Sequence, residues 1–514
     1  MNNNVRITLL LFVTSLLPLS AQPLQWGDQG NGRYRNPILL ADYSDPDVIR
    51  VGKKYYMVAS DFHFIGMQIL ESADLVNWNI VTQVYHRFDY PGWDTNSHYA
   101  GGSWAPAIRY HDGRFWIYFC TPDEGLFMTQ AKKPEGPWSP LHQVNPSPKW
   151  EDPCPFWDDD GQAYLGRSQH GAGPIIIHKM SPDGRTLLDD GVTVYEGPVA
   201  EGTKFLKLDG WYYISIPEGG VESGWQTVLR SRNIYGPYEK RMVLEQGTTN
   251  INGPHQGALV DAPDGRWWFI HFQHAGAIGR IVHLQPVSWH DGWPQVGVDL
   301  DGNGVGEPVE EWEMPSGKST PRLPQTSDEF KSKQLSPQWQ WNHNPDDSAW
   351  SLSEHQGSLT LHTLPANHIM TARNTLTQKV MGYESEVTVA IDVSHIADGT
   401  HCGLACMGMM NQTLGVISAD GQRCLNISNA WGMERNVGEP LTADMVYLRL
   451  HLNISAQAYQ YYYSLDGEAF TPAGEPFFIG FGHWKGVRFG IYNYNTQGSD
   501  GYIMLPWVHY DIMR

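Results

Sequence analysis

Five residues with chemically useful side chains stand at similar places in five sequence repeats. Each repeat contains a turn glycine, and these are Gly52, Gly113, Gly161, Gly210 and Gly265. Seven to ten residues before the turns stand Asp45, Trp104, Asp152, Glu201 and His255. If the repeats fold alike, these five residues occupy equivalent positions. The register therefore predicts three carboxylates, one Trp and one His around a common pocket.

Three carboxylates in one pocket are suited to the cleavage of a glycosidic bond. Neighbouring like charges disfavour each other's ionisation, so the pKa of at least one carboxyl rises and that group keeps its proton. The protonated carboxyl can protonate the leaving oxygen, while an ionised one acts from the opposite face of the sugar ring. A pocket of this kind therefore predicts a glycosidase.

Each of these residues, taken alone, also has a structural explanation. Asp45 and Asp152 precede prolines, and Asp-Pro is common in turns. Glu201 alone fits a solvated surface, Trp104 fits a core, and His255 fits a buried polar position. The shared register is what favours the functional interpretation.

The repeats also indicate the fold. A strand rich in aromatic residues follows each turn, as in Trp211–Ile214, and an Asp precedes the glycine in the last four repeats. Asp-Gly between apolar runs is a strong hairpin signal. The turns recur every 50 to 60 residues or so, about the spacing of propeller blades. We therefore predict a five-bladed β-propeller; the alternative is a β-sandwich, whose turn signals come about every 8–12 residues.

The chain after the propeller has a different pattern. Residues 308–326 are rich in Pro and Ser and are predicted to form a linker. Residues 327–514 contain segments that alternate with a period of two, such as Ser358–His362 and Tyr447–Leu452, as half-buried antiparallel strands do. The sequence thus predicts an all-β protein, with a propeller over residues 22–307 and a β-sandwich over residues 327–514.

Residues 1–21 have the pattern of a secretory signal peptide. Arg6 precedes the apolar run Ile7–Leu19, and small residues stand before Gln22. The apolar run is too short to span a membrane, and no later segment has the required apolar length. We therefore expect export to the periplasm or the extracellular space.

Composition limits the partners and the redox chemistry. A formal net charge of −20 argues against nucleic acid as a partner, because neutralising phosphates needs clustered Lys and Arg. The 5 Cys exclude a complete disulfide framework, although Cys402, Cys406 and Cys424 are close enough in sequence for one bridge. No Cys spacing indicates a zinc site.

The motifs around these residues resemble those of glycoside hydrolase family 43. They are Asn36–Leu39 with Ser44–Ile49, Ser103–Pro106, Glu151–Pro153 with Asp158–Gly161, and His255 with Asp264–Trp268. The resemblance covers residues 36 to about 300. Residues 325–514 resemble the concanavalin-like sandwich that follows the propeller in many β-xylosidases of that family. This second resemblance is carried by Phe470–Pro472, Trp484–Gly486 and Phe489–Tyr492.

The resemblance implies roles in an inverting, single-displacement hydrolysis. Asp45 is expected to be the general base, Glu201 the general acid, and Asp152 the residue that orients the acid and tunes its pKa. Arg280 matches an Arg that members of the family aim at the sugar hydroxyls. His255 matches a His near the propeller axis, where some members hold a calcium ion or water; no cofactor is expected to be required.

Two aromatic residues are further candidates, and three positions depart from the family pattern. Trp104 and Phe64 are candidate walls of the sugar pocket, and a core role for Phe64 is an equal alternative. The acid motif reads Glu201-Gly202-Thr203 instead of Glu-Gly-Pro, although Lys207 follows at the usual distance. Ile281-Val282 stands where many members have Glu-Thr, and Gln256 where many have a small residue. The last two departures leave the identity of the sugar open.

The expected activity is release of a terminal pentose, β-D-xylose or α-L-arabinofuranose, from plant cell-wall polysaccharide or oligosaccharide. An endo-arabinanase is one alternative. A non-catalytic carbohydrate-binding propeller and a structural adhesion protein are others, but neither needs acidic residues at equivalent register. The sandwich either binds polysaccharide, or braces the propeller and lends a loop to the pocket.

Overall fold

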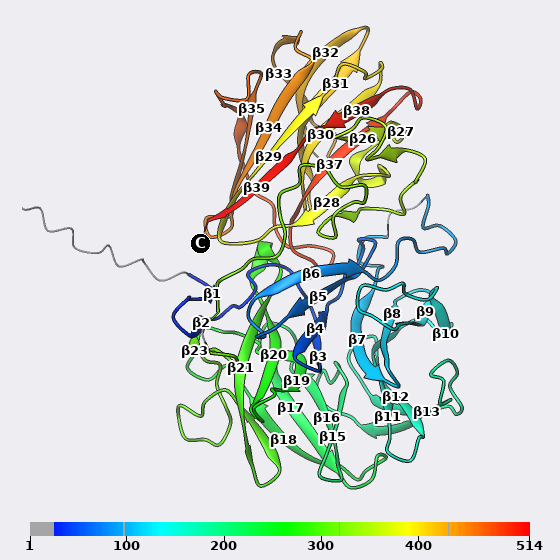
Figure 1. The fold of residues 1–514 in the computed structure, drawn as a ribbon, viewed down its shortest axis with the longest axis vertical. Helices are drawn as coiled ribbons and strands as arrows, with labels where there is room; N and C mark the ends of the chain where they lie inside the picture. Colours follow the sequence, from blue (N-terminus) through cyan, green and yellow to red (C-terminus); the bar gives the residue numbers. More distant parts are fainter. Residues whose placement is uncertain (1–24, 96–97, 318, 430, 514) are drawn as a thin grey trace, which may run out of the picture.

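The computed structural model describes residues 25–95, 98–317, 319–429 and 431–513; the predicted signal peptide lies outside them. Figure 1 shows two units of β-structure stacked along the long axis of the molecule, with the N-terminal unit below and the C-terminal unit above. The helices of the described residues are two short 3-10 segments, η1 (Gly276–Ile278) and η2 (Ile369–Thr371). The prediction of an all-β protein is confirmed.

The lower unit consists of five four-stranded antiparallel sheets, each built from consecutive strands. Blade 1 is β3 (Asp47–Val51), β4 (Lys54–Val58), β5 (Gln68–Ser72) and β6 (Trp78–Gln83). Blade 2 is β7 (Trp104–His111), β8 (Arg114–Thr121), β9 (Gly125–Ala131) and β10 (His142–Asn145). Blade 3 is β11 (Trp150–Trp157), β12 (Ala163–Gln169), β13 (Ile175–Met180) and β14 (Val192–Tyr195).

The remaining two blades complete a closed ring. Blade 4 is β15 (Lys204–Leu208), β16 (Trp211–Glu218), β17 (Trp225–Ser231) and β18 (Glu239–Leu244). Blade 5 is β19 (His255–Asp261), β20 (Trp267–His274), β21 (Arg280–His290) and β22 (Trp293–Val296). The first strands of neighbouring blades contact one another all the way round, from β3 through β7, β11, β15 and β19 back to β3. The predicted five-bladed propeller is therefore confirmed, and its first strands line the axis.

The turn glycines adopt the backbone conformation that the hairpin prediction requires. Gly52, Gly113, Gly161, Gly210 and Gly265 join the first and second strands of the five blades at φ values between 64° and 86°. This left-handed region is readily available to glycine because it has no Cβ. The turns thus set the register from which the inner strands can be counted.

A short sheet flanks the propeller and uses part of the predicted linker. It consists of β1 (Gly27–Asp28), β2 (Arg33–Arg35) and β23 (Glu311–Glu313). Residues 308–326, predicted as a linker, thus contribute one strand that pairs with the start of the chain. Next to this sheet, the Ile38 amide donates to the Val282 carbonyl of blade 5.

The upper unit is a sandwich of two eight-stranded sheets. One contains β24 (Gln340–Trp341), β28 (Leu376–Lys379), β37 (Arg488–Asn495), β30 (Thr400–Met407), β31 (Gln412–Ala419), β32 (Gln422–Asn429) and β33 (Glu434–Leu441), with β27 (Leu364–Pro365) parallel to β37. The other contains β25 (Trp350–Ser351), β26 (Leu359–His362), β38 (Tyr502–Leu505), β29 (Glu384–Asp392), β34 (Met445–Asn453), β35 (Ala458–Ser464) and β36 (Thr471–Phe477), with β39 (Val508–Met513) beside β29. Buried and partly exposed residues alternate along β34, as its sequence pattern predicts.

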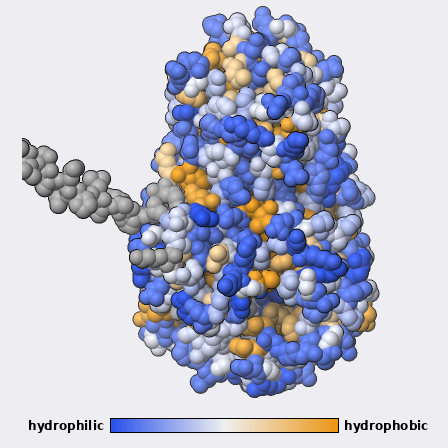
Figure 2. Space-filling view, viewed as in Figure 1, coloured by the Kyte–Doolittle hydropathy of each residue, from blue (hydrophilic) through white to orange (hydrophobic). Residues whose placement is uncertain are grey.

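A buried ion pair joins the two units. Arg488, the first residue of β37, donates to Asp61 of the propeller at 2.7 Å, and both side chains are 2% exposed. Gln340 also donates to Asp61, at 2.5 Å, and the Lys379 ammonium lies 3.6 Å from the same carboxylate. On the face seen in Figure 2, hydrophobic groups are scattered over a mostly hydrophilic surface and gather near the middle, where the units meet.

The structure answers two questions that the sequence left open, one about disulfide bridges and one about membrane-spanning helices. All 5 Cys are free thiols, so Cys402, Cys406 and Cys424 form no bridge. Neither short helix in the described part of the chain has the length and apolar character that crossing a bilayer requires.

Candidate active site

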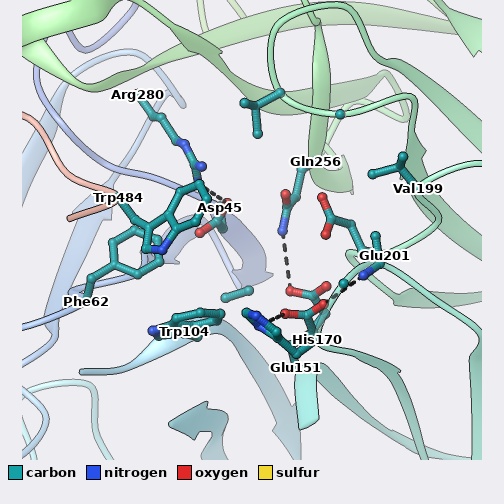
Figure 3. Close-up of a pocket in the computed structure, with 16 residues that line it drawn as sticks. Asp45, Phe62, Trp104, Glu151, His170, Val199, Glu201, Gln256, Arg280 and Trp484 are labelled. Atoms are coloured by element: carbon teal, nitrogen blue, oxygen red, sulfur yellow. Dashed lines mark hydrogen bonds and ion pairs between the residues drawn. The ribbon is translucent and has the colours of Figure 1, made fainter. Parts of the chain in front are cut away.

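A cavity of about 370 Å³ opens at the propeller axis, where the inner strands begin. It brings together Asp45, Trp104, Asp152, Glu201 and Arg280, five of the seven predicted site residues. Figure 3 shows Asp45 and Arg280 on one side of this cavity and Glu201 on the other. The cavity is also lined by Phe62, Ala105, Glu151, His170, Gly171, Ala172, Val199, Gly220, Val221, Gln256 and Trp484.

A residue in the left-handed conformation stands at or near the start of the inner strand in each blade, beside this cavity. It is Asp45, Ala105, Asp152, Gly202 or Gln256, with φ between 34° and 63°. In blades 2, 3 and 5 the pairing of the first two strands also shifts at this point, as in a β-bulge. Bulges commonly re-aim a side chain next to active sites. Here a positive φ recurs at the same place in all five blades, so the same backbone conformation borders the cavity around the ring.

Asp45 is held as a charged group. One of its oxygens accepts a hydrogen bond from the Ser60 hydroxyl at 2.5 Å, and the other accepts from Arg280 at 3.2 Å. The carboxyl is almost fully buried, so these two donors replace the water that would otherwise solvate it. Hydrogen bonds to the charged form of a carboxyl favour ionisation. Asp45 is therefore suited to accept a proton.

Asp152 connects three blades. Its Oδ2 accepts from the Ser168 hydroxyl at 2.8 Å and from the Gly202 amide at 2.7 Å. Its Oδ1 accepts more weakly from the Gln256 amide group at 3.4 Å. Burial, followed by the charge of Asp45, raises the pKa of Asp152, and the hydrogen bond from Gly202 opposes that rise. Since Gly202 adjoins Glu201, Asp152 fixes the backbone that carries the candidate acid.

Glu201 has the environment of a protonated acid. Burial, together with the charges of Asp152, Glu151 and Asp45, raises the pKa of Glu201 to about 9. One carboxylate oxygen each of Glu151, Asp152 and Glu201 lie within 4.8 Å of one another. Asp45 stands outside this close group. The cavity thus holds a clustered, proton-retaining acid and a separate, hydrogen-bonded base.

Glu151 is a fourth carboxyl in the cavity, and the sequence analysis did not assign it a role. Burial and the charge of Asp152 raise its pKa to about 8. One of its oxygens accepts from the Ala172 amide at 3.4 Å, and the other lies 3.6 Å from the imidazole of His170 at the rim. Glu151 pairs with Ser168, and the strand register shifts directly after it, so that both Glu151 and Asp152 line the cavity.

Arg280 is fixed between the base and the aromatic wall. Its guanidinium donates to the Ser44 hydroxyl at 2.7 Å as well as to Asp45. It also lies 4.9 Å from the Phe272 ring and 5.9 Å from the Trp484 ring, within cation–π range. These contacts hold the guanidinium in place, and Arg280 lines the cavity. It can therefore donate to a ligand there from a fixed position.

The prediction that Phe64 forms a wall of the pocket is wrong. Phe64 is buried in the contact between the two units, 3.8 Å from the Arg488 guanidinium and 4.2 Å from the Lys485 ammonium. Phe62, two residues earlier, lines the cavity and meets Trp104 edge to face at 5.9 Å. Trp484, from the sandwich, completes this aromatic wall beside Phe62 (Figure 3).

The expected contribution of His255 to the pocket surface is also wrong. Gln256 holds the left-handed position in blade 5 and lines the cavity, whereas His255 is fully buried behind it. The Nε2 of His255 is bonded to the Gly220 carbonyl at 2.9 Å. Burial lowers the pKa of His255 to about 4, so the imidazole is neutral. The count back from the turn reached His255, but it could not show that this side chain is buried while its neighbour Gln256 lines the cavity.

The residues around His255 do not fit a calcium site. Calcium takes six to eight oxygen ligands. Among the described residues, the group that could supply three protein ligands to a metal is Glu151, Asp152 and Glu201, and His255 does not belong to it. The Nδ1 of His255 is buried without a partner.

Lys207 lies outside the cavity even though its spacing supports Glu201. It pairs with Asp158 and Asp159 at the turn of blade 3. Its role is therefore to join blades 3 and 4.

Together, these side chains can place one general acid and one general base on two sides of a small, neutral, ring-shaped ligand. An ionised Asp45 and a protonated Glu201 face the same cavity from different blades, and aromatic side chains bound the space between them. Aromatic faces and a few well-placed polar groups are the usual components of a small-ligand site. The acid role follows from the raised pKa of Glu201, and the base role from the two hydrogen-bond donors that hold Asp45.

Comparisons with known proteins match both units. The family described as "Glycosyl hydrolases family 43" matches residues 34–294, and the "Beta xylosidase C-terminal Concanavalin A-like domain" matches residues 327–511. A protein of Xylanibacter ruminicola, provisionally named a beta-xylosidase, is 56% identical over 90% of this chain and 87% of its own. The "Beta-xylosidase" of Formosa agariphila is 38% identical over 96% of this chain and 92% of its own.

A solved structure shows the same arrangement of both units. It is a "Bifunctional GH43-CE" protein of Bacteroides eggerthii, 30% identical, with a TM-score of 0.84 over 95% of this chain. The present chain spans 64% of the length of that protein.

Proposed function

Because the chain belongs to glycosyl hydrolases family 43, we propose that its axial cavity removes a terminal pentose from a plant cell-wall oligosaccharide or polysaccharide by single displacement. The observation that carries this proposal is the contrast between two carboxyls in one cavity. No described residue donates a hydrogen bond to the carboxyl of Glu201, and the pKa of Glu201 is raised to about 9. The carboxyl of Asp45, in contrast, accepts hydrogen bonds from two donors.

The proposed reaction needs only substrate and water. Asp45 takes a proton from a water molecule, the water oxygen bonds to the anomeric carbon, and the bond to the leaving oxygen breaks. Glu201 gives its proton to that leaving oxygen. Asp152 positions Glu201 through the Gly202 amide, and the guanidinium of Arg280, which lines the cavity, donates to a sugar hydroxyl. Attack by water from the face opposite the leaving group inverts the anomeric centre.

We assign β-D-xylose as the preferred sugar, with α-L-arabinofuranose as the second candidate. The names of the two relatives with the highest identities given above support xylose. A protein of Bacteroides ovatus, named a non-reducing end alpha-L-arabinofuranosidase, is 33% identical over 64% of this chain and supports the second sugar. The polar side chain of Gln256 on the cavity wall makes it a candidate for distinguishing the two.

Substitutions that separate the two carboxyls test this proposal. We expect Asp45→Asn to lose at least 1,000-fold in kcat on every aryl β-xyloside, because general base catalysis and the charge are both removed. Glu201→Gln should lose as much on a phenyl xyloside but far less on a dinitrophenyl xyloside, whose leaving group needs no proton. Steady-state kinetics on the two substrates measures the difference.

Glu196→Gln is the matched control, because Glu196 is an exposed neighbour outside the cavity. It should retain wild-type kinetics, and all variants should keep the thermal midpoint within a few degrees. Equal losses for Glu201→Gln on both leaving groups would remove the acid role. Wild-type turnover by both site variants would overturn the whole assignment.

We further propose that the protein acts after export. The pattern of Arg6, the apolar run Ile7–Leu19 and the small residues before Gln22 supports this proposal. N-terminal sequencing of protein recovered from the periplasm or medium should begin at Gln22. An N-terminus at Met1 in the cytosolic fraction alone would contradict export.

A further inference from the structure

Exposed aromatic side chains gather at one end of the sandwich. Among the described residues, four Trp, Tyr or Phe residues are exposed, and three of them are Trp431 (74%), Phe478 (52%) and Trp484 (46%). The exposed side chains of Met409 and Met433 accompany them. We call these five residues the apolar track. Contiguous exposed apolar surface of this kind usually marks a binding site.

The apolar track begins at the catalytic cavity. Trp484 lines that cavity, and it lies on the connection between β36 and β37. Within this connection, a β-carbon built at Gly482 would stand 2.6 Å from the β-carbon of Met409. A β-carbon at Gly480 would stand 3.4 Å from the Phe478 ring. Met409 and Phe478 therefore continue the apolar surface from Trp484 outward.

The track then passes to the turn between β32 and β33. Gln412, which follows the Met409 turn, pairs with Asn429 at the end of β32. Two residues later comes Trp431, whose amide donates to the Asn429 side chain at 3.0 Å. The Met433 amide donates to the same oxygen at 3.2 Å. These two hydrogen bonds fix the backbone of Trp431 and Met433 relative to Asn429, which lowers the entropy lost on binding.

The support beneath the track is also ordered. Phe477, the neighbour of Phe478, stacks on Tyr461 with 5.2 Å between ring centroids. The Tyr461 hydroxyl donates to the Gln412 carbonyl at 2.7 Å. The turn that carries Met409 and the strand end that carries Phe478 are thus tied together.

We propose that the apolar track binds the neutral polysaccharide chain that carries the pentose cleaved in the cavity. Continuity with the cavity through Trp484 selects this occupant over an unrelated protein. Trp and Phe faces stack on sugar rings, and a neutral chain suits a protein with a net charge of −20. The inference rests on the proposed function in one respect, since it takes the bound chain to be the substrate.

Affinity electrophoresis separates binding from turnover. In an Asp45→Asn background, the protein should be retarded in a native gel that contains arabinoxylan. Adding Trp431→Ala and Phe478→Ala should remove most of that retardation. Tyr110→Ala is the matched control, because Tyr110 is 47% exposed but lies on the propeller outside the track, and it should leave the retardation unchanged.

Kinetics in the wild-type background gives a second readout. For Trp431→Ala with Phe478→Ala, we expect the KM for xylohexaose to rise roughly five- to tenfold, the effect of one or two lost aromatic contacts. The kcat/KM for 4-nitrophenyl β-D-xyloside should stay at the wild-type value, since this small substrate reaches only the cavity.

Three results would overturn the proposal. They are no retardation of the Asp45→Asn parent, unchanged retardation after loss of both aromatics, and conversion of a dimer to a monomer with binding intact. The last result, read by sedimentation, would make the track a subunit interface. Failure of the proposed function would give a different result, because the wild-type protein would then not hydrolyse aryl pentosides. The native gel would still show whether the apolar track binds polysaccharide.

Discussion

Asp45 and Glu201 carry the same functional group but meet different surroundings. Ser60 and Arg280 donate hydrogen bonds to Asp45, and these bonds stabilise its charged form. Glu201 instead lies among the carboxyls of Glu151 and Asp152, which favour its neutral form. Both carboxyls lie largely away from solvent, so the number of hydrogen-bond donors around each, more than the extent of its burial, makes Asp45 the base and Glu201 the acid.

Glu151 is predicted to set the alkaline limit of activity. The charge of Glu151 is one of the causes that raise the pKa of Glu201, so Glu151→Gln should lower that pKa. Because the acid must be protonated to work, the alkaline limb of the kcat profile should move to lower pH by about half a unit or more. Titration of kcat between pH 6 and 10 measures the shift.

His170→Ala is the control for this experiment, because it removes the neighbour of Glu151 at the rim and leaves the carboxyl in place. Its alkaline limb should stay close to that of the wild type. An unchanged limb for Glu151→Gln, with reduced kcat at all pH values, would mean that Glu151 only contacts substrate.

At the scale of strands, the inner-strand starts decide which side chains reach the cavity. The repeat register led to Asp45, Asp152 and Glu201 because the turn glycines fix the count along each first strand. It failed at His255 because the count does not reveal that this side chain is fully buried and that its neighbour Gln256 lines the cavity instead. Taking one residue from each blade also left out Glu151, although its place directly before Asp152 could have suggested it.

The strand β37 is predicted to hold the sandwich connection against the propeller. Arg488→Met leaves Asp61 buried with only Gln340 and the more distant Lys379 as partners. We expect a loss of about 3 kcal/mol in stability, the lower end for breaking a buried ion pair. Asp61 also follows Ser60, so the KM for aryl xylosides should rise. Thermal unfolding and steady-state kinetics measure both effects.

Arg423→Met is the comparison, because Arg423 pairs with Asp444 at the surface of the same sandwich. Exposed pairs contribute at most about 1 kcal/mol. The combination of Asp61→Asn with Arg488→Met should recover part of the lost stability. A thermal midpoint for Arg488→Met equal to that of the wild type would show that the pair does not join the units.

At the scale of the whole molecule, the catalytic cavity is a joint product of two units. The propeller supplies the carboxyls and Arg280, and the sandwich supplies Trp484. Period-two patterning identified the sandwich, and repeat spacing identified the propeller. Neither pattern could place Phe64 in the junction or Trp484 in the cavity, because contacts between units depend on three-dimensional docking that local periodicity does not encode.

This joint construction also explains the expected mode of attack on a chain. Trp484 and Phe62 bound the cavity near Asp45, and Glu201 stands on the opposite side (Figure 3). A terminal sugar in this space would lie between the two carboxyls, with the remainder of the chain outside. Release of terminal units is the activity that the family relationship supports.

The anomeric form of the first sugar released from xylobiose tests the central claim most directly. Proton NMR recorded within the first minutes should show α-xylose before mutarotation, since water activated by Asp45 attacks the face opposite the bond that Glu201 protonates. Initial release of β-xylose would mean that a carboxylate forms a covalent intermediate, and it would contradict the roles assigned to both residues.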